Sequence, residues 1–535
     1  MAKNLFAKTV PLALFILRLD RIRIPLWLVG LSFFTIIMPV AFQNLYGDAK
    51  EDIAGMTETM KNPAMTAMLG PGNLENYTIG AMTAHQMLLM TAVIVGLMGI
   101  LLVAKHTRAD EEDGRLEMIR SLPSGKLSYL SATLLVTIGT SVVLALVNGI
   151  GLYALGIETM NLEGSLLYGA ALGATLLFFG GMTAVFAQLS ESSRGTMGLS
   201  IAVLLISYLV RGMTDVSNEA LSWISPLGLV TKAEVYWNNN WGPILLMVGA
   251  SFLLFILANV LNAVRDLESG FIPAKPGRKY ASAFLQNPIG LSLRLQRTGI
   301  ISWAVGMYVL GASYGSVLGD IEAFIGDNEL YSQILVSVDG FSLMEQFLPM
   351  LVIVITLIGV IPPIMAINKV RAEEKKGRLE HLLSRAVSRM RLLGGYITIS
   401  VMTGFVMSSL GAIGLWSAGT AVLEEGLSFR MIYGAFMSYF PAMLVMIGVS
   451  SLLIAYLPKL TSLIWVYVFY GFIVIYFGSI FQIPNWAAKL SPFGHVPQAP
   501  IEDVTFLPIF LLSVFAVLLL TIGLLGYKKR DMEYQ

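Results

Sequence analysis

Two nearly identical charged phrases interrupt long apolar stretches of this sequence. EEDGRLEMIR runs from Glu111 to Arg120, and EEKKGRLEHL begins at Glu373. In each phrase, carboxylates precede an arginine by a few residues. Carboxylates and guanidinium groups form charge-assisted hydrogen bonds with each other and with complementary surfaces. The chemistry that we expect from these phrases is therefore ion pairing and docking.

Other kinds of chemistry have little support in the sequence. The chain has no cysteine, and its four histidines are scattered, so we expect no catalytic residue and no metal site. A phosphate-binding loop of the G-x-x-x-x-G-K-[ST] type is also missing, because the SGK at Ser124 lacks the upstream glycine. We therefore predict that this chain is not an enzyme and that it binds no cofactor in such a loop.

Apolar side chains dominate the composition. Of the 535 residues, 56% are hydrophobic and 13% are charged, whereas a soluble chain carries about 25% charged residues. Most of the surface is therefore expected to face something other than water. The formal net charge is +1, so the composition does not point to nucleic acid as a partner.

Apolar runs of about 20 residues can cross a membrane as helices, and we count twelve of them. The first follows a long basic stretch and lacks a small-residue cleavage site, so we interpret it as a retained span. The sequence thus predicts an all-α integral membrane protein with twelve transmembrane helices. The runs lie near 25–43, 83–104, 127–153, 164–188, 197–212, 241–262, 299–319, 347–368, 393–418, 430–455, 460–481 and 505–526.

The positions of lysine and arginine predict the orientation, because these residues stay on the cytoplasmic side. With twelve spans and the N-terminus inside, most of the 35 basic residues fall on cytoplasmic segments. The loop from Asp320 to Glu345 contains acids and no base, and we expect it outside. In this arrangement both termini and both charged phrases are cytoplasmic.

The two halves of the chain repeat each other in order. Each half has six predicted spans, an even number, so both halves have the same orientation, as in parallel repeats. We divide the chain into a first six-helix half (1–264), a cytoplasmic linker with an interfacial helix (265–298) and a second six-helix half (299–535). The matched segments are LRLDR at Leu17 and LRLQR at Leu293, GRLE at Gly114 and Gly377, SPLGLV at Ser225 and SPFGHV at Ser491, and the arginines Arg265 and Arg530.

Each charged phrase is predicted to be a short amphipathic helix. Glu111 precedes Arg115 by four residues, and Glu374 precedes Arg378 in the same way, which is the favourable order for a helical ion pair. The glycine inside each phrase weakens a helix and indicates a bend or a close approach. One interpretation leaves the helix on the membrane surface with its charges in water. The other is that two copies at equivalent places suit a symmetric partner.

The pattern acid-acid-x-x-Gly-Arg-Leu-Glu, followed by a basic stretch and a span, resembles the membrane subunit of type-2 ABC exporters. The resemblance is closest to a fused twelve-span bacterial group linked to efflux of polyketide and polyether antibiotics, and it implies the bacterial cytoplasmic membrane. It also implies that each phrase is a coupling helix that docks on an ATPase. Because the stretch after GRLE differs between the halves, we expect either unequal docking surfaces or a single productive one. The implied residues are Glu111, Glu112, Gly114, Arg115, Leu116, Glu117, Glu373, Glu374, Gly377, Arg378, Leu379 and Glu380.

The repeated Ser-Pro-x-Gly turns are the second feature to which the resemblance assigns a role. It suggests short re-entrant or interfacial elements near an outer gate, and an ordinary loop turn explains the same residues equally well. The residues are Ser225, Pro226, Gly228, Ser491, Pro492 and Gly494. The sequence assigns no residue to substrate binding.

Sequence and resemblance together predict the permease subunit of an ATP-driven exporter. Because one chain carries both membrane halves, we expect two copies of a separate ABC ATPase, which would bind ATP and Mg. Spans with few polar groups favour a hydrophobic small-molecule substrate. Polyketide- or polyether-type antibiotics or ionophores, and hence drug resistance, rest on the resemblance alone. A lipid or a hydrophobic peptide is the alternative substrate.

An ion-gradient-driven secondary carrier is the main rival, since such carriers also have twelve spans in two parallel halves. Carriers place ionisable groups at membrane depth, where each is costly and kept for function. Here His85, Arg211 and Glu345 are expected near the outer ends of spans, where long side chains reach water by snorkelling. The apparent lack of buried ionisable groups therefore favours the ATP-driven exporter. A membrane-embedded enzyme or scaffold is a third class with little support.

Overall fold

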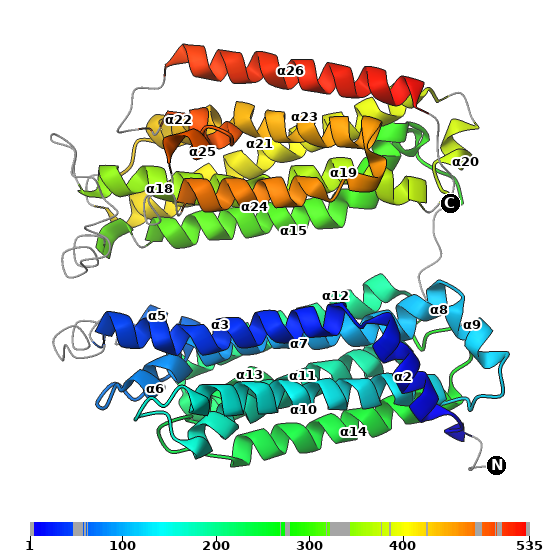
Figure 1. The fold of residues 1–535 in the computed structure, drawn as a ribbon, viewed down its shortest axis with the longest axis vertical. Coiled ribbons are helices and arrows are strands. Elements are labelled where there is room, and N and C mark those ends of the chain that lie inside the picture. The colour runs from blue at the N-terminus through cyan, green and yellow to red at the C-terminus, as the bar shows by residue number, and fades with distance from the viewer. Residues whose placement is uncertain are drawn as a thin grey trace. The chain divides into compact units, whose positions relative to one another are not determined.

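The chain forms two compact helical units, Met1–Gly277 (unit 1) and Arg278–Gln535 (unit 2), and each is described by itself (Figure 1). Within the described residues every regular element is a helix, and an isolated bridge joins Ser190 and Ile272. The prediction of an all-α integral membrane protein is confirmed. The structure, a computed structural model, describes residues 5–46, 57, 60, 63–267, 269–272, 279–316, 318–320, 343–375, 377–384, 387–423, 426–476, 484–497, 499 and 505–530.

Unit 1 contains long apolar helices joined by short helical segments. Its elements are α2 (Thr9–Leu19), α3 (Arg23–Tyr46), α5 (Pro63–Leu69), α6 (Ile79–Thr83), the π-helix η1 (Ala84–Leu88), α7 (Leu89–Ala104), the π-helix η2 (Lys105–Ala109), α8 (Asp110–Glu112), α9 (Arg115–Arg120), α10 (Ser128–Ala154), α11 (Leu162–Leu189), α12 (Ser193–Ser217), the 3₁₀-helix η3 (Glu219–Ile224), α13 (Pro226–Thr231) and α14 (Gly242–Val264).

Unit 2 follows a similar order. Its elements are the 3₁₀-helix η4 (Ala283–Gln286), α15 (Pro288–Ser316), the 3₁₀-helix η5 (Leu318–Asp320), α18 (Leu343–Gly359), α19 (Ile361–Lys375), α20 (Glu380–Leu383), α21 (Arg389–Val422), α22 (Phe429–Ser438), α23 (Phe440–Tyr456), the 3₁₀-helix η6 (Pro458–Leu460), α24 (Leu463–Tyr476), α25 (Asn485–Ala488), the 3₁₀-helix η7 (Pro492–His495) and α26 (Phe506–Lys529).

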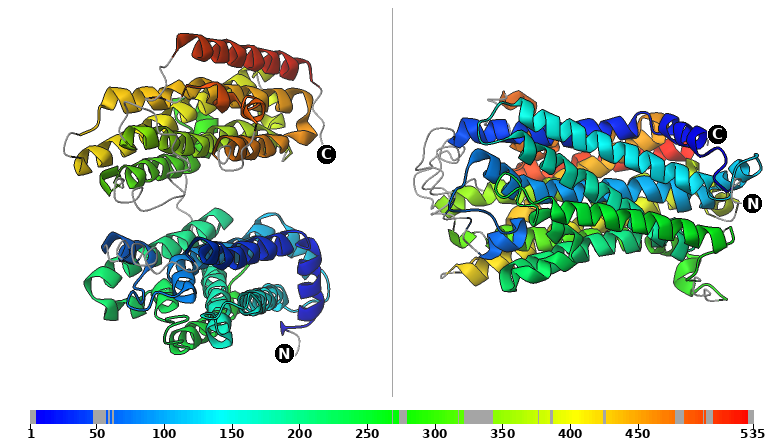
Figure 2. Two further views of the ribbon diagram at one scale, coloured as in Figure 1. Left: turned by 60° about the vertical axis from the view of Figure 1, so that its left-hand side comes forward. Right: turned by 90° about the horizontal axis from the view of Figure 1, so that it is seen from below.

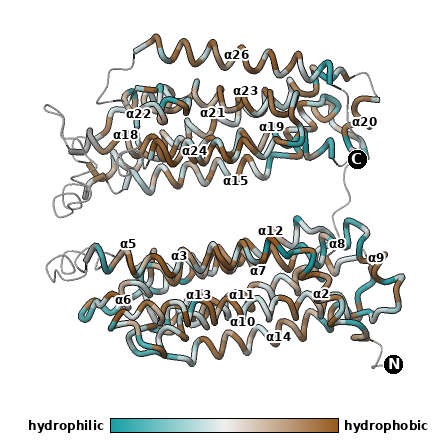
Figure 3. The backbone as a smooth tube through the Cα atoms, viewed as in Figure 1, coloured by the Kyte–Doolittle hydropathy of each residue, from teal (hydrophilic) through white to brown (hydrophobic). Residues whose placement is uncertain are grey.

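Ten helices within the described ranges are long and apolar enough to cross a membrane. Figure 3 shows their hydrophobic middles and more polar ends. The expected seventh span lies in α15, and the expected eleventh lies in the 14 described residues of α24; neither is among the ten. The count of twelve therefore stays a prediction.

The segments before the first span of each half differ from each other. In unit 1, α2 is separated from α3 by a turn that begins at Asp20, and the two helices point in different directions (Figure 2). In unit 2, α15 runs without a break across residue 298. The interfacial helix expected within 265–298 thus corresponds to η4 and the first turns of α15, and the proposed boundary at 298 falls inside a helix.

The inner end of the second span is also built differently in the two units. In unit 2, α18 ends at Gly359 and α19 begins at Ile361, because Pro362 and Pro363 cannot both be accommodated in a continuous helical ladder. In unit 1, α7 passes into η2, and the helix has a kink at His106, whose φ of −89° and ψ of 16° are not helical. Irregular turns of this kind are common at functional positions.

Glycines allow the closest helix contacts in both units. A Cβ atom on Gly169 of α11 would lie 2.1 Å from the carbonyl oxygen of Ala145 in α10. In unit 2, a Cβ atom on Gly311 of α15 would lie 2.3 Å from the carbonyl oxygen of Gly411 in α21. Because the opposing atoms belong to backbone, a side chain there must push the two helices apart.

Gly311→Ala is expected to destabilise unit 2, whereas Gly306→Ala in the same helix is expected to be neutral. A Cβ atom on Gly306 meets nothing within 4 Å, so this control adds a methyl group without a clash. Overpacking a well-packed contact costs about 1–3 kcal/mol. The measurement is the melting temperature of the two purified variants in detergent. Equal melting temperatures would show that α15 and α21 are not held in this close contact.

Candidate functional site

Each charged phrase folds as a helix end, a glycine turn and a short helix. In unit 1, α8 ends at Glu112, Gly114 adopts φ +73°, and α9 follows. In unit 2, α19 ends at Lys375 and Gly377 adopts φ +67° before α20. A positive φ is costly for any residue with a Cβ atom. The glycine predicted to weaken a helix therefore forms the turn between two helices.

The buried acid of the first phrase is paired with two arginines. Glu111 is 5% exposed, and its carboxylate lies 2.9 Å from Nη1 of Arg108. Arg265 donates to both oxygens of the same carboxylate, over 2.9 and 2.7 Å. This cluster of Arg108, Glu111 and Arg265 is called triad 1. The expected pair between Glu111 and Arg115 is not formed, because Arg115 donates to Asp110 at 2.7 Å instead.

Triad 1 connects three parts of unit 1. Arg265, directly after α14, also donates from Nε to the amide oxygen of Gln188 in α11 at 3.0 Å. Arg265 and Arg108 both donate to the carbonyl oxygen of Ser269, at 2.6 and 2.9 Å. Because Glu111 belongs to α8, the triad fixes the start of the glycine turn to the ends of α11 and α14.

Unit 2 contains an equivalent cluster, triad 2, formed by Arg371, Glu374 and Arg530. Glu374 is 3% exposed, lies 3.2 Å from Nη1 of Arg371, and accepts a hydrogen bond from Arg530. Arg371 donates to the carbonyl oxygen of Pro458 at 3.1 Å, and Arg530 donates to that of Ile454 at 2.7 Å. Triad 2 thus fixes α19 to the ends of α23 and α26.

The expected ion pair between Glu374 and Arg378 is also not formed, and Arg378 has another partner. Arg378 lies 3.2 Å from Glu373, whereas Glu374 is engaged in triad 2. The same exchange occurs in both units: the exposed arginine of GRLE pairs with the acid before the expected one. The i,i+4 rule fails here because the glycine turn ends the first helix between the two partners.

Unit 1 has an additional chain of buried charges. His106 is fully buried, with Nε2 2.5 Å from the Asp20 carboxylate and Nδ1 3.1 Å from that of Asp110. Tyr129 donates to Asp110 at 2.6 Å, and Lys105 pairs with Asp20. Burial alone would raise the pKa of Asp20, but the hydrogen bonds from Lys105 and His106 hold that pKa below its ordinary value. This chain joins the end of α2 to the glycine turn.

These groups correct the expectation that buried ionisable residues are nearly absent. Arg211 and Asp215, in the last turns of α12, are also buried and form an ion pair at 3.1 Å. Arg211 therefore does not reach water by snorkelling. His85 is likewise enclosed, with Nδ1 2.9 Å from the Tyr77 hydroxyl and Nε2 2.9 Å from the carbonyl oxygen of Gly70. The described buried charges lie near span ends and have partners.

The twelve residues predicted for coupling separate into two groups. Glu111, Leu116, Glu373, Glu374 and Leu379 are buried, whereas Glu112, Arg115, Glu117, Arg378 and Glu380 are exposed. Gly114 and Gly377 are intermediate. Their role in docking stays a prediction.

The apolar residues of the phrases anchor the short helices. Leu116 packs in a cluster with Ala13 and Ile16 of α2, and Leu379 packs with Ile367 and Tyr396. Glu112 accepts hydrogen bonds from the backbone N–H and hydroxyl of Ser193, at 2.9 and 2.6 Å, where α12 begins. Each phrase thus has an inner side fixed to its unit and an outer side made of charges.

The Ser-Pro-x-Gly residues lie at the opposite end of each unit and form short helices. Pro226 begins α13, and Pro492 begins η7. A Cβ atom on Gly228 would lie 2.0 Å from the carbonyl oxygen of Ser222, and one on Gly494 would lie 2.2 Å from that of Ala488. The Ser225 hydroxyl donates to the carbonyl oxygen of Ser207 at 2.7 Å. The repeated glycines are explained by these close contacts, and a gating role stays a prediction.

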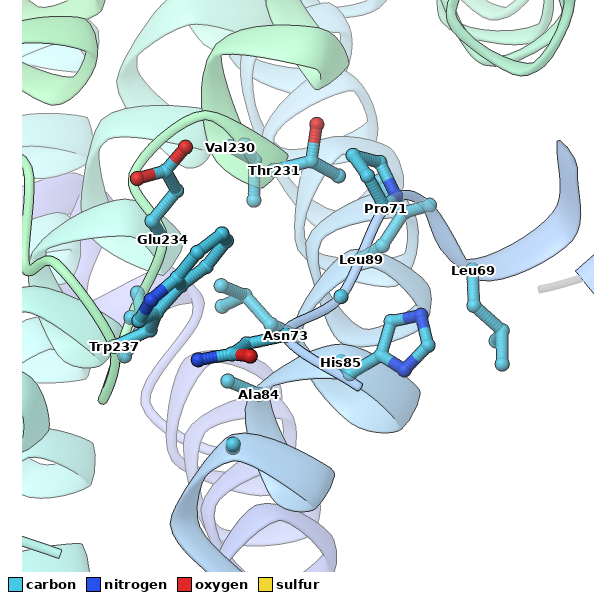
Figure 4. Close-up of a pocket in the computed structure, with 14 residues that line it drawn as sticks. Leu69, Pro71, Asn73, Ala84, His85, Leu89, Val230, Thr231, Glu234 and Trp237 are labelled. Atoms are coloured by element: carbon cyan, nitrogen blue, oxygen red, sulfur yellow. The ribbon is translucent and has the colours of Figure 1, made fainter. Parts of the chain in front are cut away.

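A pocket borders this end of unit 1 (Figure 4). It is lined by His85 from η1, by residues that follow α13, including Glu234 and Trp237, and by the loop with Asn73. Glu234, Tyr236 and Asn239 have positive φ angles of 46°, 62° and 49°. Three residues of one loop thus have strained backbone angles next to a π-helix, and such strain persists only where the surrounding structure fixes the backbone.

Nothing in the described part of the chain has the arrangement of a metal centre. Sequence reasoning missed both triads, although it recognised Arg265 and Arg530 as repeated residues. The available signal was the recurrence of an arginine three residues before each buried acid, as Arg108 and Arg371. With Arg265 and Arg530, these residues form a set of two arginines and one acid that recurs in each half.

Glu111→Gln is expected to destabilise the protein, whereas Glu117→Gln is expected to have little effect. The first change leaves Arg108 and Arg265 buried without their shared carboxylate, and breaking a buried pair in this way costs about 3–5 kcal/mol. Glu117 is exposed, so its loss affects only surface charge. The measurement is the melting temperature of each purified variant, compared with that of the unchanged protein. Similar values for both would contradict the description of triad 1 as a structural cluster.

Comparison with known proteins gives a consistent result over nearly the whole chain. Residues 9–261 and 285–528 match the family model described as "Multidrug efflux system permease Rv1217c, C-terminal domain". The multidrug efflux system permease protein Rv1217c of Mycobacterium tuberculosis is 31% identical over 534 residues, which cover 99% of this chain and 96% of that protein. One matched segment lies in each unit.

Proposed function

From the membership of this chain in the family of multidrug efflux system permeases, we propose that it is the transmembrane permease subunit of an ATP-driven exporter. The proposal extends the family assignment in three respects: the energy source, the partner and the class of substrate. It places the chain in the bacterial cytoplasmic membrane with both termini and both charged phrases on the cytoplasmic side.

The construction of the two charged phrases is the observation that carries this proposal. In each unit, a buried acid holds the glycine turn to the bundle through two arginines. The residues that follow the turn, Glu117 in unit 1 and Glu380 in unit 2, are exposed. A rigidly held turn with exposed charges on its outer side suits an element that transmits the movement of a docked partner. The glycine turn and the short helix after it, at Gly114–Arg120 in unit 1 and Gly377–Leu383 in unit 2, are called levers below. Two such levers suit two copies of one partner.

The partner supplies the energy in this proposal. The full sequence has no phosphate-binding loop of the Walker type, so ATP and Mg are assigned to a separate ABC ATPase, present in two copies. ATP binding would draw the two copies together and move both levers. The movement would then change which side of the membrane the transport path faces.

A hydrophobic small molecule is the proposed cargo. The described buried charges lie near span ends and are paired, so the middles of the spans present mainly apolar and hydroxyl groups. The name of the relative describes multidrug efflux, which supports a drug-like substrate. We assign polyketide- or polyether-type antibiotics or ionophores to this chain as the first class to test, followed by a lipid or a hydrophobic peptide.

An ion-gradient-driven carrier is the second candidate function, and one observation favours it. His106 is buried between the carboxylates of Asp20 and Asp110, and carriers keep ionisable groups inside the protein for function. The two candidates differ in what the purified chain does alone. A carrier moves substrate into proteoliposomes when only a pH gradient is imposed, whereas the ATP-driven exporter requires the ATPase and ATP.

Charge reversal on the exposed side of both levers tests the proposed docking. We expect Glu117→Lys combined with Glu380→Lys to reduce the amount of co-purified ATPase at least about tenfold, a change that corresponds to about 1.4 kcal/mol of binding free energy. Both side chains are exposed, so folding should be retained. Elution volume and melting temperature of the variant should match those of the unchanged protein.

Glu158→Lys is the matched control for this experiment. Glu158 is exposed and lies between α10 and α11, at the end of unit 1 opposite to α9. This control should retain the ATPase fully. If the double variant binds the ATPase and exports substrate as well as the control does, the docking proposal is wrong.

A further inference from the structure

A small pocket of unit 1 lies at the level where three spans end. Its walls come from α9, the start of α10 and the last turns of α11 and α14. It holds about 320 Å³ of empty space, its open mouth included. Most of this space belongs to the open mouth, so the pocket suits a single small group at the end of a larger molecule or a small ion.

Arg120, the last residue of α9, brings a positive charge to this pocket. Its guanidinium forms no hydrogen bond or ion pair with any residue that the structure describes, and its Nε atom is buried. Burial lowers the pKa of Arg120, although an arginine stays protonated in proteins. A buried polar group without a partner calls for an unseen ligand or water.

Two further donors line the same space. Lys126 donates to the carbonyl oxygen of Ala263 at 2.7 Å, which leaves two of its three ammonium hydrogens for other acceptors. The side chain of Asn262 is 6% exposed and has no hydrogen-bond partner in the described part of the chain. The pocket wall therefore contains a guanidinium, an ammonium and an amide group.

The acid in the pocket wall does not cancel these charges. Glu111 lines the pocket but is already engaged by Arg108 and Arg265 in triad 1. Arg120 and Lys126 add two positive charges to the pocket wall, and these charges favour an anion.

We propose that this pocket binds a phosphate group, supplied by the headgroup of an anionic membrane phospholipid or by soluble phosphate. Arginine presents a planar fork of donors that matches phosphate oxygens, and lysine adds a compact charge. The position at the ends of three spans is the level of lipid headgroups, where basic pockets between helices bind anionic lipids. A bound phosphate ties α9 to α10 and α14.

Unit 2 has a different residue at the position equivalent to Arg120, which provides a control within the same chain. Arg120 is the sixth residue after Gly114, and the sixth residue after Gly377 is Leu383. The arginine of the proposed phosphate site therefore belongs to the first lever and is not repeated at this position in the second. It does not depend on the proposed ATPase, since it rests on charges within unit 1.

Thermal unfolding of the full chain in detergent tests the proposal. Phosphatidylglycerol should raise the melting temperature in a saturable way, whereas phosphatidylcholine should not. Inorganic phosphate at constant ionic strength forms a separate arm that distinguishes the soluble source from the lipid. Arg120→Leu gives α9 the residue found at the equivalent position in unit 2, and Arg120→Lys keeps the charge without the fork.

Arg194→Leu is the matched control, because Arg194 is exposed, lies in the first turn of α12 and does not line the pocket. We expect Arg120→Leu to remove at least half of the lipid- or phosphate-induced shift, Arg120→Lys to retain part of it, and Arg194→Leu to leave it unchanged. If neither ligand shifts the unchanged protein, or if Arg120→Leu and Arg194→Leu reduce the shift equally, the proposal is overturned.

Discussion

A carboxylate can be buried at the end of an apolar helix bundle only if positive partners surround it, and this constraint shapes both charged phrases. Leaving such a charge unpaired costs several kcal/mol. Glu111 and Glu374 are each paired with two arginines. In each unit, one arginine lies three residues before the acid and the other lies at the end of the last span. The glycine turn, the short helix after it and the exposed charges all take their positions from this pairing.

The fold class and the repeated motif could be predicted from the sequence, because hydropathy and internal repeats are visible in short stretches of it. The ion pairs could not be predicted in this way. The four-residue spacing from Glu111 to Arg115 predicts a pair on a continuous helix, but Gly114 adopts a positive φ and ends that helix. The true partner, Arg265, lies in another part of the chain, and only packing brings it to Glu111. The burial of Arg211 was not foreseen either, although its partner Asp215 lies four residues further along the same helix.

The two units share their triads and differ around them. Unit 1 has the buried chain from Asp20 through His106 to Asp110, whereas LRLQR places Gln296 where LRLDR has Asp20. Unit 2 instead breaks its second span beside Pro362. The first lever is therefore tied to α2 by charges that the second lacks. This difference gives a physical basis for the expectation, made from the stretches after GRLE, that the two levers are unequal.

The central claim is that the triads transmit movement from the levers to the bundle, and the coupling ratio tests it most directly. Arg265→Lys and Arg530→Lys each keep the charge but lose the guanidinium fork. In Arg265 the fork binds both oxygens of Glu111, and in Arg530 it joins Glu374 to the carbonyl oxygen of Ile454. In proteoliposomes with the ATPase, we expect each variant to hydrolyse several-fold more ATP per substrate molecule exported than the unchanged permease does. An unchanged ratio in both variants, with ATPase binding and export intact, would contradict the account.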